Sequence, residues 1–108
     1  MRLHDEFEWD PKKASANRKK HGVTFEDAAE VLGDDEGDVY NVDLPDDEHS
    51  MGEDRYVTFG SHPDDRSIIL RISWTTRSAN KRRVTRIISA RHATRKERKH
   101  YAQEISGE

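Results

Sequence analysis

Three apolar stretches in the second half of the chain most constrain its fold, because their residues alternate between apolar and polar with a period of two. The stretches are RYVTFG (55–60), SIILRISW (67–74) and RRVTRIISA (82–90). Such alternation is typical of strands that bury one face, and turn-forming segments such as SHPDDR separate the stretches. Strands joined by short turns pair antiparallel, so this part of the chain predicts an antiparallel sheet.

The alternation in the last of these strands also predicts which face each side chain occupies. Strict alternation puts Arg86 on one face and both Ser89 and Arg91 on the other. One of the two arginines should therefore point away from the buried side of the sheet. The pattern alone does not indicate which face the helices cover.

Capping residues mark the helices of the chain. Asp10 and Pro11 are typical of a helix start, and Gly22 is typical of the left-handed residue that ends a helix. Thr24 can cap a second helix, and Thr94 forms a capping box with the glutamate three residues later. The expected helices cover residues 10–21, 24–32 and 94–105.

The segment between the second helix and the sheet is acidic and rich in turn-forming residues. We expect residues 33–54 to form a loop that contains a short extended piece at Val39–Val42 and in which His49 braces the chain. With a short strand at residues 5–9, the elements follow the order β-α-α-β-β-β-α. We therefore predict a single α+β domain over residues 1–108, with a mostly antiparallel sheet of three to four strands and flanking helices.

The composition fits a small folded domain without a membrane segment. Leu, Ile, Val and Phe number 19 of 108 residues, so the core must be small, although these residues cluster in periodic runs. No stretch is long and apolar enough to span a membrane, and the first residues lack the apolar core of a secretory signal. The chain contains no cysteine, which excludes disulfides and thiolate metal sites. These features favour the cytoplasm.

The charge of the chain is strongly segregated, although its net value is only −3. Residues 24–66 hold 15 acidic and 2 basic residues, whereas residues 67–108 hold 11 basic and 3 acidic residues. The final helix belongs to this basic region and lacks a broad apolar stripe, so core packing alone does not explain it. A basic surface of this kind favours a polyanion or an acidic partner. The candidate binding residues are Lys20, Arg95, Lys96, Arg98 and Lys99.

Three motifs resemble the BrnT family of type II toxins: FEWDPKKASANRKKHGVTFEDAAEVL near the start, HSMGEDRYVTFG in the middle and RIISARHATRKERKHY at the end. Their order and spacing match from Phe7 to Tyr101. The resemblance implies a RelE-like fold, a ribonuclease activity that needs no metal and blocks translation, and neutralisation by a cognate antitoxin. It also implies that the antitoxin carries a DNA-binding domain, so that toxin and antitoxin form a hetero-oligomer that represses its own operon.

RNA cleavage without a metal requires a base, an acid and cations near the phosphate. The 2′-hydroxyl attacks phosphorus while a base removes its proton, and an acid protonates the leaving 5′-oxygen. Arginine suits the negative charge that develops, because its planar fork pairs with two phosphate oxygens. The candidate catalytic arginines are Arg91 and Arg86, and the candidate acid or base residues are His92 and His21. Both kinds of residue also have a structural interpretation. The arginines can belong to a solvated basic face, and a histidine at a helix end can have an ordinary structural role.

Three functions are compatible with these features. The first is a ribonuclease toxin, and the second is a non-catalytic module that docks an antitoxin or nucleic acid through its basic C-terminal face. The third, a DNA-binding regulator, is disfavoured because phosphates would repel the acidic second helix. No cofactor is expected, and the scattered histidines show no metal-ligand spacing. Trp9 and Trp74 are interpreted as packing residues rather than base-stacking platforms.

Overall fold

The chain folds into an α+β structure, and the computed structural model describes residues 6–33, 42–45, 55–79 and 82–106. The expected brace at His49, and most of the expected extended piece at Val39–Val42, lie outside the described residues. Each of the three helices begins and ends within one residue of its expected bounds. The elements in chain order are β1 (Phe7–Glu8), α1 (Pro11–His21), α2 (Phe25–Gly33), β2 (Val42–Pro45), β3 (Arg55–Ser61), β4 (Ile69–Ala79), β5 (Arg82–His92) and α3 (Arg95–Ser106).

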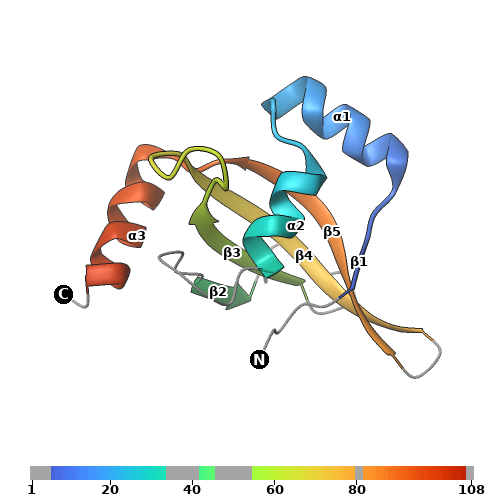
Figure 1. The fold of residues 1–108 in the computed structure, drawn as a ribbon. Helices are drawn as coiled ribbons and strands as arrows, with labels where there is room; N and C mark the ends of the chain where they lie inside the picture. The colour runs from blue at the N-terminus through green and yellow to red at the C-terminus, as the bar shows by residue number, and fades with distance from the viewer. Residues whose placement is uncertain (1–5, 34–41, 46–54, 80–81, 107–108) are drawn as a thin grey trace.

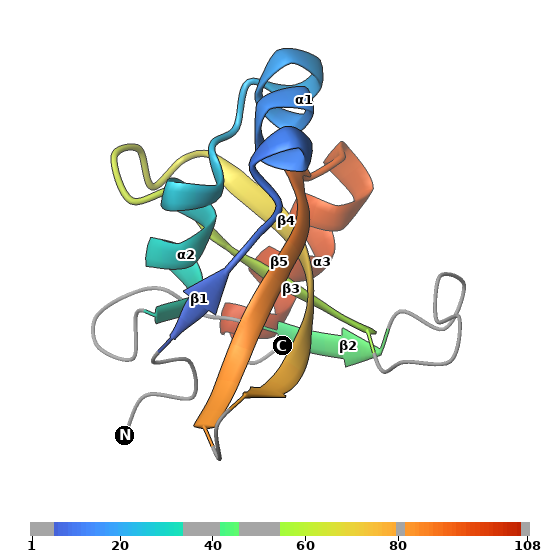
Figure 2. The same cartoon turned by 90° about the vertical axis from the view of Figure 1, so that its right-hand side faces the viewer.

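The sheet has five strands in the order β1-β5-β4-β3-β2 (Figures 1 and 2). The strands from β2 to β5 pair antiparallel with their neighbours, and β1 joins the other side of β5 in parallel. The predicted fold class is therefore confirmed, and the sheet is one strand wider than the widest expectation. The additional strand is β2, whose VDLP sequence has weak strand propensity and becomes extended because it pairs with β3.

Helices pack on both faces of the sheet. α2 packs on the face that carries the main core, and α1 follows the edge of the sheet near β5 (Figure 2). α3 lies against the opposite face, where the buried Tyr101 joins Val57 and Phe59 in a smaller cluster. No helix in the described part of the chain is long and apolar enough to cross a membrane. The main core consists of Val23, Phe25, Ala28, Val31, Leu32, Leu70, Ile72, Trp74, Ile87 and Ala90.

Both tryptophans pack with the main core, as the sequence suggested. Trp74 is buried, stacks on Tyr56 with ring centroids 4.8 Å apart, and donates its indole N–H to the hydroxyl of Thr58 at 2.8 Å. Trp9 packs edge-on against Phe25 at a centroid distance of 6.0 Å. Such aromatic pairs stabilise a core beyond the area that they bury, which matters in a chain with few large apolar residues.

A β-bulge in β5 changes which of its side chains share a face. Ser89 pairs with Ser73 of β4, but the next β4 residue, Trp74, pairs with Ile87. Ile88 is therefore an extra residue without a partner in β4. The alternation of side chains before the bulge is shifted by one position relative to the alternation after it.

The bulge brings the two candidate arginines of β5 to the same face. Arg91 pairs with Arg71 and Arg86 pairs with Thr75, and positions 71 and 75 of β4 lie on one face. The expectation that Arg86 and Arg91 point to opposite faces is therefore wrong. Strict alternation gave the wrong face because it assumes that every residue of β5 has a partner in β4. The extra residue at the bulge is visible only in the pairing of β5 with β4.

A buried asparagine, rather than an apolar stripe, fixes α1 to the sheet. Asn17 is the buried residue of this helix. Its side-chain amide donates to the carbonyl oxygens of Ala90 at 2.8 Å and Val23 at 3.0 Å, and its side-chain oxygen accepts from the Ala90 N–H at 3.1 Å. The side chain thus pairs with the outer edge of β5 beyond the end of β1, much as a neighbouring strand would, and satisfies buried backbone groups.

Candidate nucleic-acid interface

Among the side chains that the structure describes, five arginines from three neighbouring strands lie on the face of the sheet against which α3 packs. Arg71 and Arg77 occupy odd-numbered positions of β4, and odd positions of a regular strand share a face. Arg55 of β3 reaches the same face because it pairs with position 75 of β4, and the bulge adds Arg86 and Arg91 of β5. We call these five residues the arginine face.

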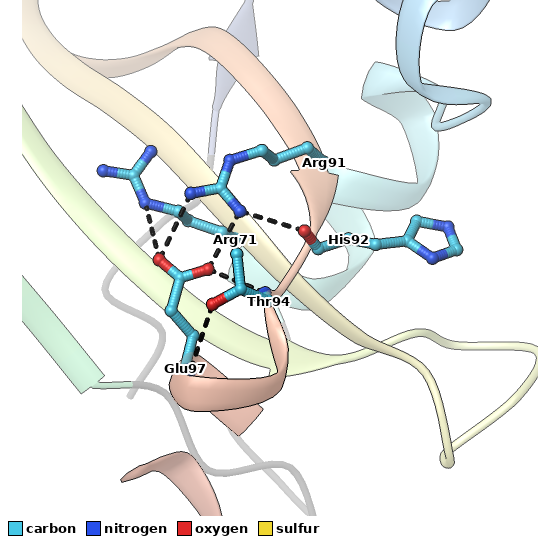
Figure 3. Close-up of polar contacts among 5 residues, drawn as sticks. All are labelled: Arg71, Arg91, His92, Thr94 and Glu97. Atoms are coloured by element: carbon cyan, nitrogen blue, oxygen red, sulfur yellow. Dashed lines mark hydrogen bonds and ion pairs between the residues drawn. The ribbon is translucent and has the colours of Figure 1, made fainter. Parts of the chain in front are cut away.

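Glu97, near the start of α3, joins two residues of the arginine face (Figure 3). Its carboxylate accepts two hydrogen bonds from Arg91, from Nη1 to Oε1 at 2.9 Å and from Nη2 to Oε2 at 3.2 Å. Nε of Arg71 lies 3.5 Å from the same Oε2. Both guanidinium groups are within reach of solvent, since Arg91 is 31% exposed and Arg71 is 23% exposed. Two adjacent guanidinium groups with one carboxylate between them form a site that suits an anion.

Glu97 also begins α3, through the capping box that the sequence predicted. The Thr94 N–H donates to Oε1 of Glu97 at 2.8 Å, and the Thr94 hydroxyl accepts from the Glu97 N–H at 3.2 Å. Burial raises the pKa of Glu97, but the hydrogen bonds from Arg91 and Thr94 and the charge of Arg91 lower the pKa by more, so it lies below its ordinary value. The carboxylate is therefore ionised at neutral pH and holds Arg91 in place.

A second carboxylate joins two further residues of the arginine face. Glu8 of β1 lies beside Arg86 in the parallel ladder, and its Oε2 contacts Nη1 of Arg86. The same Oε2 lies 3.3 Å from Nη1 of Arg77. Arg77 is 57% exposed and Arg86 is 29% exposed. The arginine face thus holds two clusters of the same composition, each with two arginines and one glutamate.

The basic residues expected on the last helix are presented to solvent. Thr94 and Glu97 place the start of α3 directly beside Arg91, so cations on its first two turns extend the arginine face at this end. Lys20 is also exposed, but it lies on α1, away from α3 (Figure 1). The exposed cations of α3 are Arg95, Lys96, Arg98 and Lys99.

The two candidate histidines are not brought together with these arginines. The backbone carbonyl of His92 accepts a hydrogen bond from Nη1 of Arg91 at 3.0 Å, but its exposed imidazole points away from the Arg71, Arg91 and Glu97 side chains (Figure 3). His21 is half-buried at the end of α1. An acid or base on the arginine face itself must therefore come from another residue, or the RNA must reach past the edge of β5.

One group of side chains among the described residues has ligand atoms close enough to hold a metal ion. Asp27, His62 and Asp64 bring one such atom each to within 4.8 Å of one another. These groups already bond to one another: Nε2 of His62 lies 3.1 Å from a carboxylate oxygen of Asp27, and its Nδ1 accepts from the Asp64 N–H at 3.0 Å. The contacts link the turn after β3 to α2, and the group takes no part in the arginine face.

Sequence reasoning missed Arg55, Arg71, Arg77 and Glu8 as members of the interface, and it gave Glu97 only a capping role. Arg71 had a usable signal, because it alternates with the apolar residues of its strand and so had to lie opposite the main core. Glu8 had none, since its role depends on the parallel pairing of β1 with β5, which joins residues 78 positions apart.

A comparison with known families adds to this geometry. Residues 9–97, most of the chain, match the family model described as a ribonuclease toxin, BrnT, of type II toxin-antitoxin systems. No curated protein matches the chain.

Proposed function

The chain belongs to the BrnT family of ribonuclease toxins of type II toxin-antitoxin systems, and we propose that it is an endoribonuclease that binds RNA on its arginine face, cleaves it without a metal and thereby inhibits translation. The observation that carries this proposal is the pair of partly exposed guanidinium groups of Arg71 and Arg91, held side by side by Glu97. Rigid, pre-oriented cations of this kind stabilise developing charge at low reorganisation cost.

The proposed reaction uses the RNA's own 2′-hydroxyl as nucleophile. A bond forms between the 2′-oxygen and phosphorus, and the bond from phosphorus to the 5′-oxygen breaks. The 2′-hydroxyl proton goes to a base, and an acid supplies the proton of the new 5′-hydroxyl, leaving a 2′,3′-cyclic phosphate. Arg91 and Arg71 stabilise the additional charge on the phosphoryl oxygens, and Arg86 binds phosphate on the same face.

We propose His92 as the first candidate for proton transfer, with His21 as the second. His92 adjoins Arg91 in the chain and its ring is exposed, whereas His21 is half-buried on α1. RNA that crosses from the arginine face over the end of β5 can bring its sugar to His92. A bell-shaped pH–rate profile that loses one limb in His92→Ala, but not in His21→Ala, would support this order; the reverse result would exchange the two roles.

The family implies an antitoxin partner, and we propose that this antitoxin has a DNA-binding domain and covers the exposed cations of α3. Acidic side chains of an antitoxin can pair with Arg95, Lys96, Arg98 and Lys99 and so compete with RNA for this end of the interface. The complex is then a hetero-oligomer, and we place it in the cytoplasm, where the RNA is translated.

A non-catalytic binding module is the second candidate function. One observation favours it: within the described part of the chain, no histidine lies at the Arg71–Glu97–Arg91 cluster, so an anion bound there would have no imidazole beside it for proton transfer. Such a module would bind RNA or antitoxin through the same arginines and leave the RNA intact.

The test of the proposed function is incubation of purified, antitoxin-free protein with RNA in excess EDTA. We expect cleavage to persist in EDTA, to fall strongly in Arg91→Ala, and to be unchanged in Arg83→Ala, which removes an exposed arginine from the same hairpin but the opposite face. The double variant Asp27→Asn/His62→Ala removes the candidate metal group found among the described residues and should also cleave normally. Cleavage that disappears with EDTA and returns with magnesium would overturn the metal-free mechanism, and intact RNA under all conditions would favour the binding module.

A further inference from the structure

The cluster of Glu8, Arg77 and Arg86 repeats the composition of the cluster around Glu97, at the other end of the arginine face. We infer that it is a second phosphate-binding subsite, which holds the RNA strand beyond the phosphodiester that is cleaved. This inference rests on the proposed function and adds to it the length and path of the RNA. It requires that the two clusters share a face, suit the same ligand and lie a suitable distance apart.

The strand register places the two clusters on the same face of the β4–β5 pair, one toward each end. Arg71 pairs with Arg91 at one end, and Arg86 pairs with Thr75 at the other. Ser73 and its partner Ser89 lie between them on the same face; Ser73 is buried and Ser89 is half-buried, so a strand that joins the clusters passes over Ser89. Four residues of β4 separate the paired positions, which corresponds to about 13 Å along the strand.

The charge of each cluster matches one phosphodiester. Two guanidinium groups and one carboxylate leave one positive charge, and a phosphodiester carries one negative charge. In both clusters one glutamate contacts nitrogens of two arginines, through both oxygens in Glu97 and through Oε2 alone in Glu8, and phosphate oxygens can make the same contacts. A phosphate can therefore bind beside each glutamate and share its arginines, which leaves the cluster with no net charge.

The exposure of the second cluster also suits a ligand that arrives from solvent. Arg77 is 57% exposed and its Nη1 contact with Glu8 is 3.3 Å long, so its guanidinium group can turn toward RNA at little cost. Arg86 is less exposed and contacts Glu8 more closely, which fixes its position. With Arg86 fixed and Arg77 able to move, the cluster can bind the phosphates of RNA strands that differ in conformation.

A purely structural brace is the competing explanation, in which Glu8 only ties β1 to its neighbours. The two explanations differ in their effect on substrates of different length. A dinucleotide carries one internucleotide phosphate and cannot span both clusters, whereas a hexanucleotide can. A subsite affects the hexanucleotide more than the dinucleotide, and a brace affects both equally through stability.

The experiment compares Arg77→Ala with Arg83→Ala, both of which remove an exposed arginine from the β4–β5 hairpin but from opposite faces. For Arg77→Ala we expect the ratio of hexanucleotide to dinucleotide kcat/KM to fall about threefold to tenfold, mainly through KM. For Arg83→Ala we expect no change in that ratio. An unchanged ratio in Arg77→Ala would overturn the inference while leaving the proposed function intact.

Binding of a non-cleavable hexanucleotide, with 2′-O-methyl groups in place of the 2′-hydroxyls, separates this inference from the proposed function. Each phosphate contact releases counterions, so Arg77→Ala should flatten the dependence of log Kd on log salt by about 0.7. The same measurement applies if the protein proves not to cleave RNA. A slope equal to that of the unmodified protein would contradict the second subsite, whatever the catalytic result.

Discussion

Arg91 and Glu97 face each other through two parallel hydrogen bonds, of 2.9 and 3.2 Å, which join the end of the sheet to the start of α3. The same glutamate caps the helix through the Thr94 N–H and contacts Arg71. Formation of α3 and alignment of the two guanidinium groups therefore depend on one side chain.

Replacement of Arg91 should show whether its planar fork or only its charge matters. For Arg91→Ala we expect kcat for RNA cleavage to fall about 100-fold, because a pre-oriented donor to the transition state is lost. Arg91→Lys keeps the charge but loses the paired hydrogen bonds, so we expect a loss nearly as large. Single-turnover kinetics with saturating enzyme measure this step. Full activity in Arg91→Lys would show that the cluster acts only as a point charge.

The lowered pKa of Glu97 predicts how stability depends on pH. Because its folded-state pKa lies below the unfolded value of about 4.5, the ionised carboxylate stabilises the fold above that pH. This contribution is lost as the pH falls through the folded-state pKa. In Glu97→Gln the neutral amide cannot titrate, so we expect the free energy of unfolding to decrease by roughly 1 kcal/mol at pH 7 and to fall less steeply below pH 4.5.

Urea unfolding of both proteins across this range of pH measures the difference. The matched control is Glu26→Gln, at an exposed position in the first turn of α2. If Glu97→Gln and the unmodified protein lose stability in parallel below pH 4.5, the ion pair with Arg91 does not stabilise the fold.

Asn17 should be among the most sensitive positions of the first half of the chain. Asn17→Ala removes three hydrogen bonds and leaves the N–H and carbonyl groups of Ala90 without their partner. We expect a destabilisation of about 2–4 kcal/mol, measured by urea unfolding. Lys19→Ala, at an exposed position of the same helix, should change stability by less than about 0.5 kcal/mol. Similar losses in both variants would mean that the helix is held by other contacts.

Charge reversal on α3 tests the role of its exposed cations. We expect Lys96→Glu/Arg98→Glu to fold normally, because both side chains are exposed, and to bind RNA and antitoxin more weakly. Lys12→Glu/Lys13→Glu on α1 makes the same change in net charge away from α3 and serves as the control. Electrophoretic mobility shifts at two salt concentrations measure RNA affinity. If both double variants lose affinity equally, net charge rather than the surface of α3 governs binding.

The helices and the regular strands of this protein follow from the sequence because their signals are local. Asp10 caps α1 by accepting from the Lys12 N–H at 2.9 Å, and Gly22 ends it with a positive φ of 71°. Alternation in β4 correctly separates its core residues from Arg71. Each of these features depends on residues a few positions apart, so the sequence contains the whole signal.

The arginine face depends on contacts between distant residues, and only the tertiary structure decides it. The bulge at Ile88 allows both Ile87 and Ala90 to enter the main core, and as a consequence Arg86 and Arg91 share the opposite face. No pattern within β5 contains this shift, because it arises where β5 pairs with β4. The roles of Glu8 and Asn17 likewise require partners 78 and 73 positions away, which are brought near only when the sheet forms.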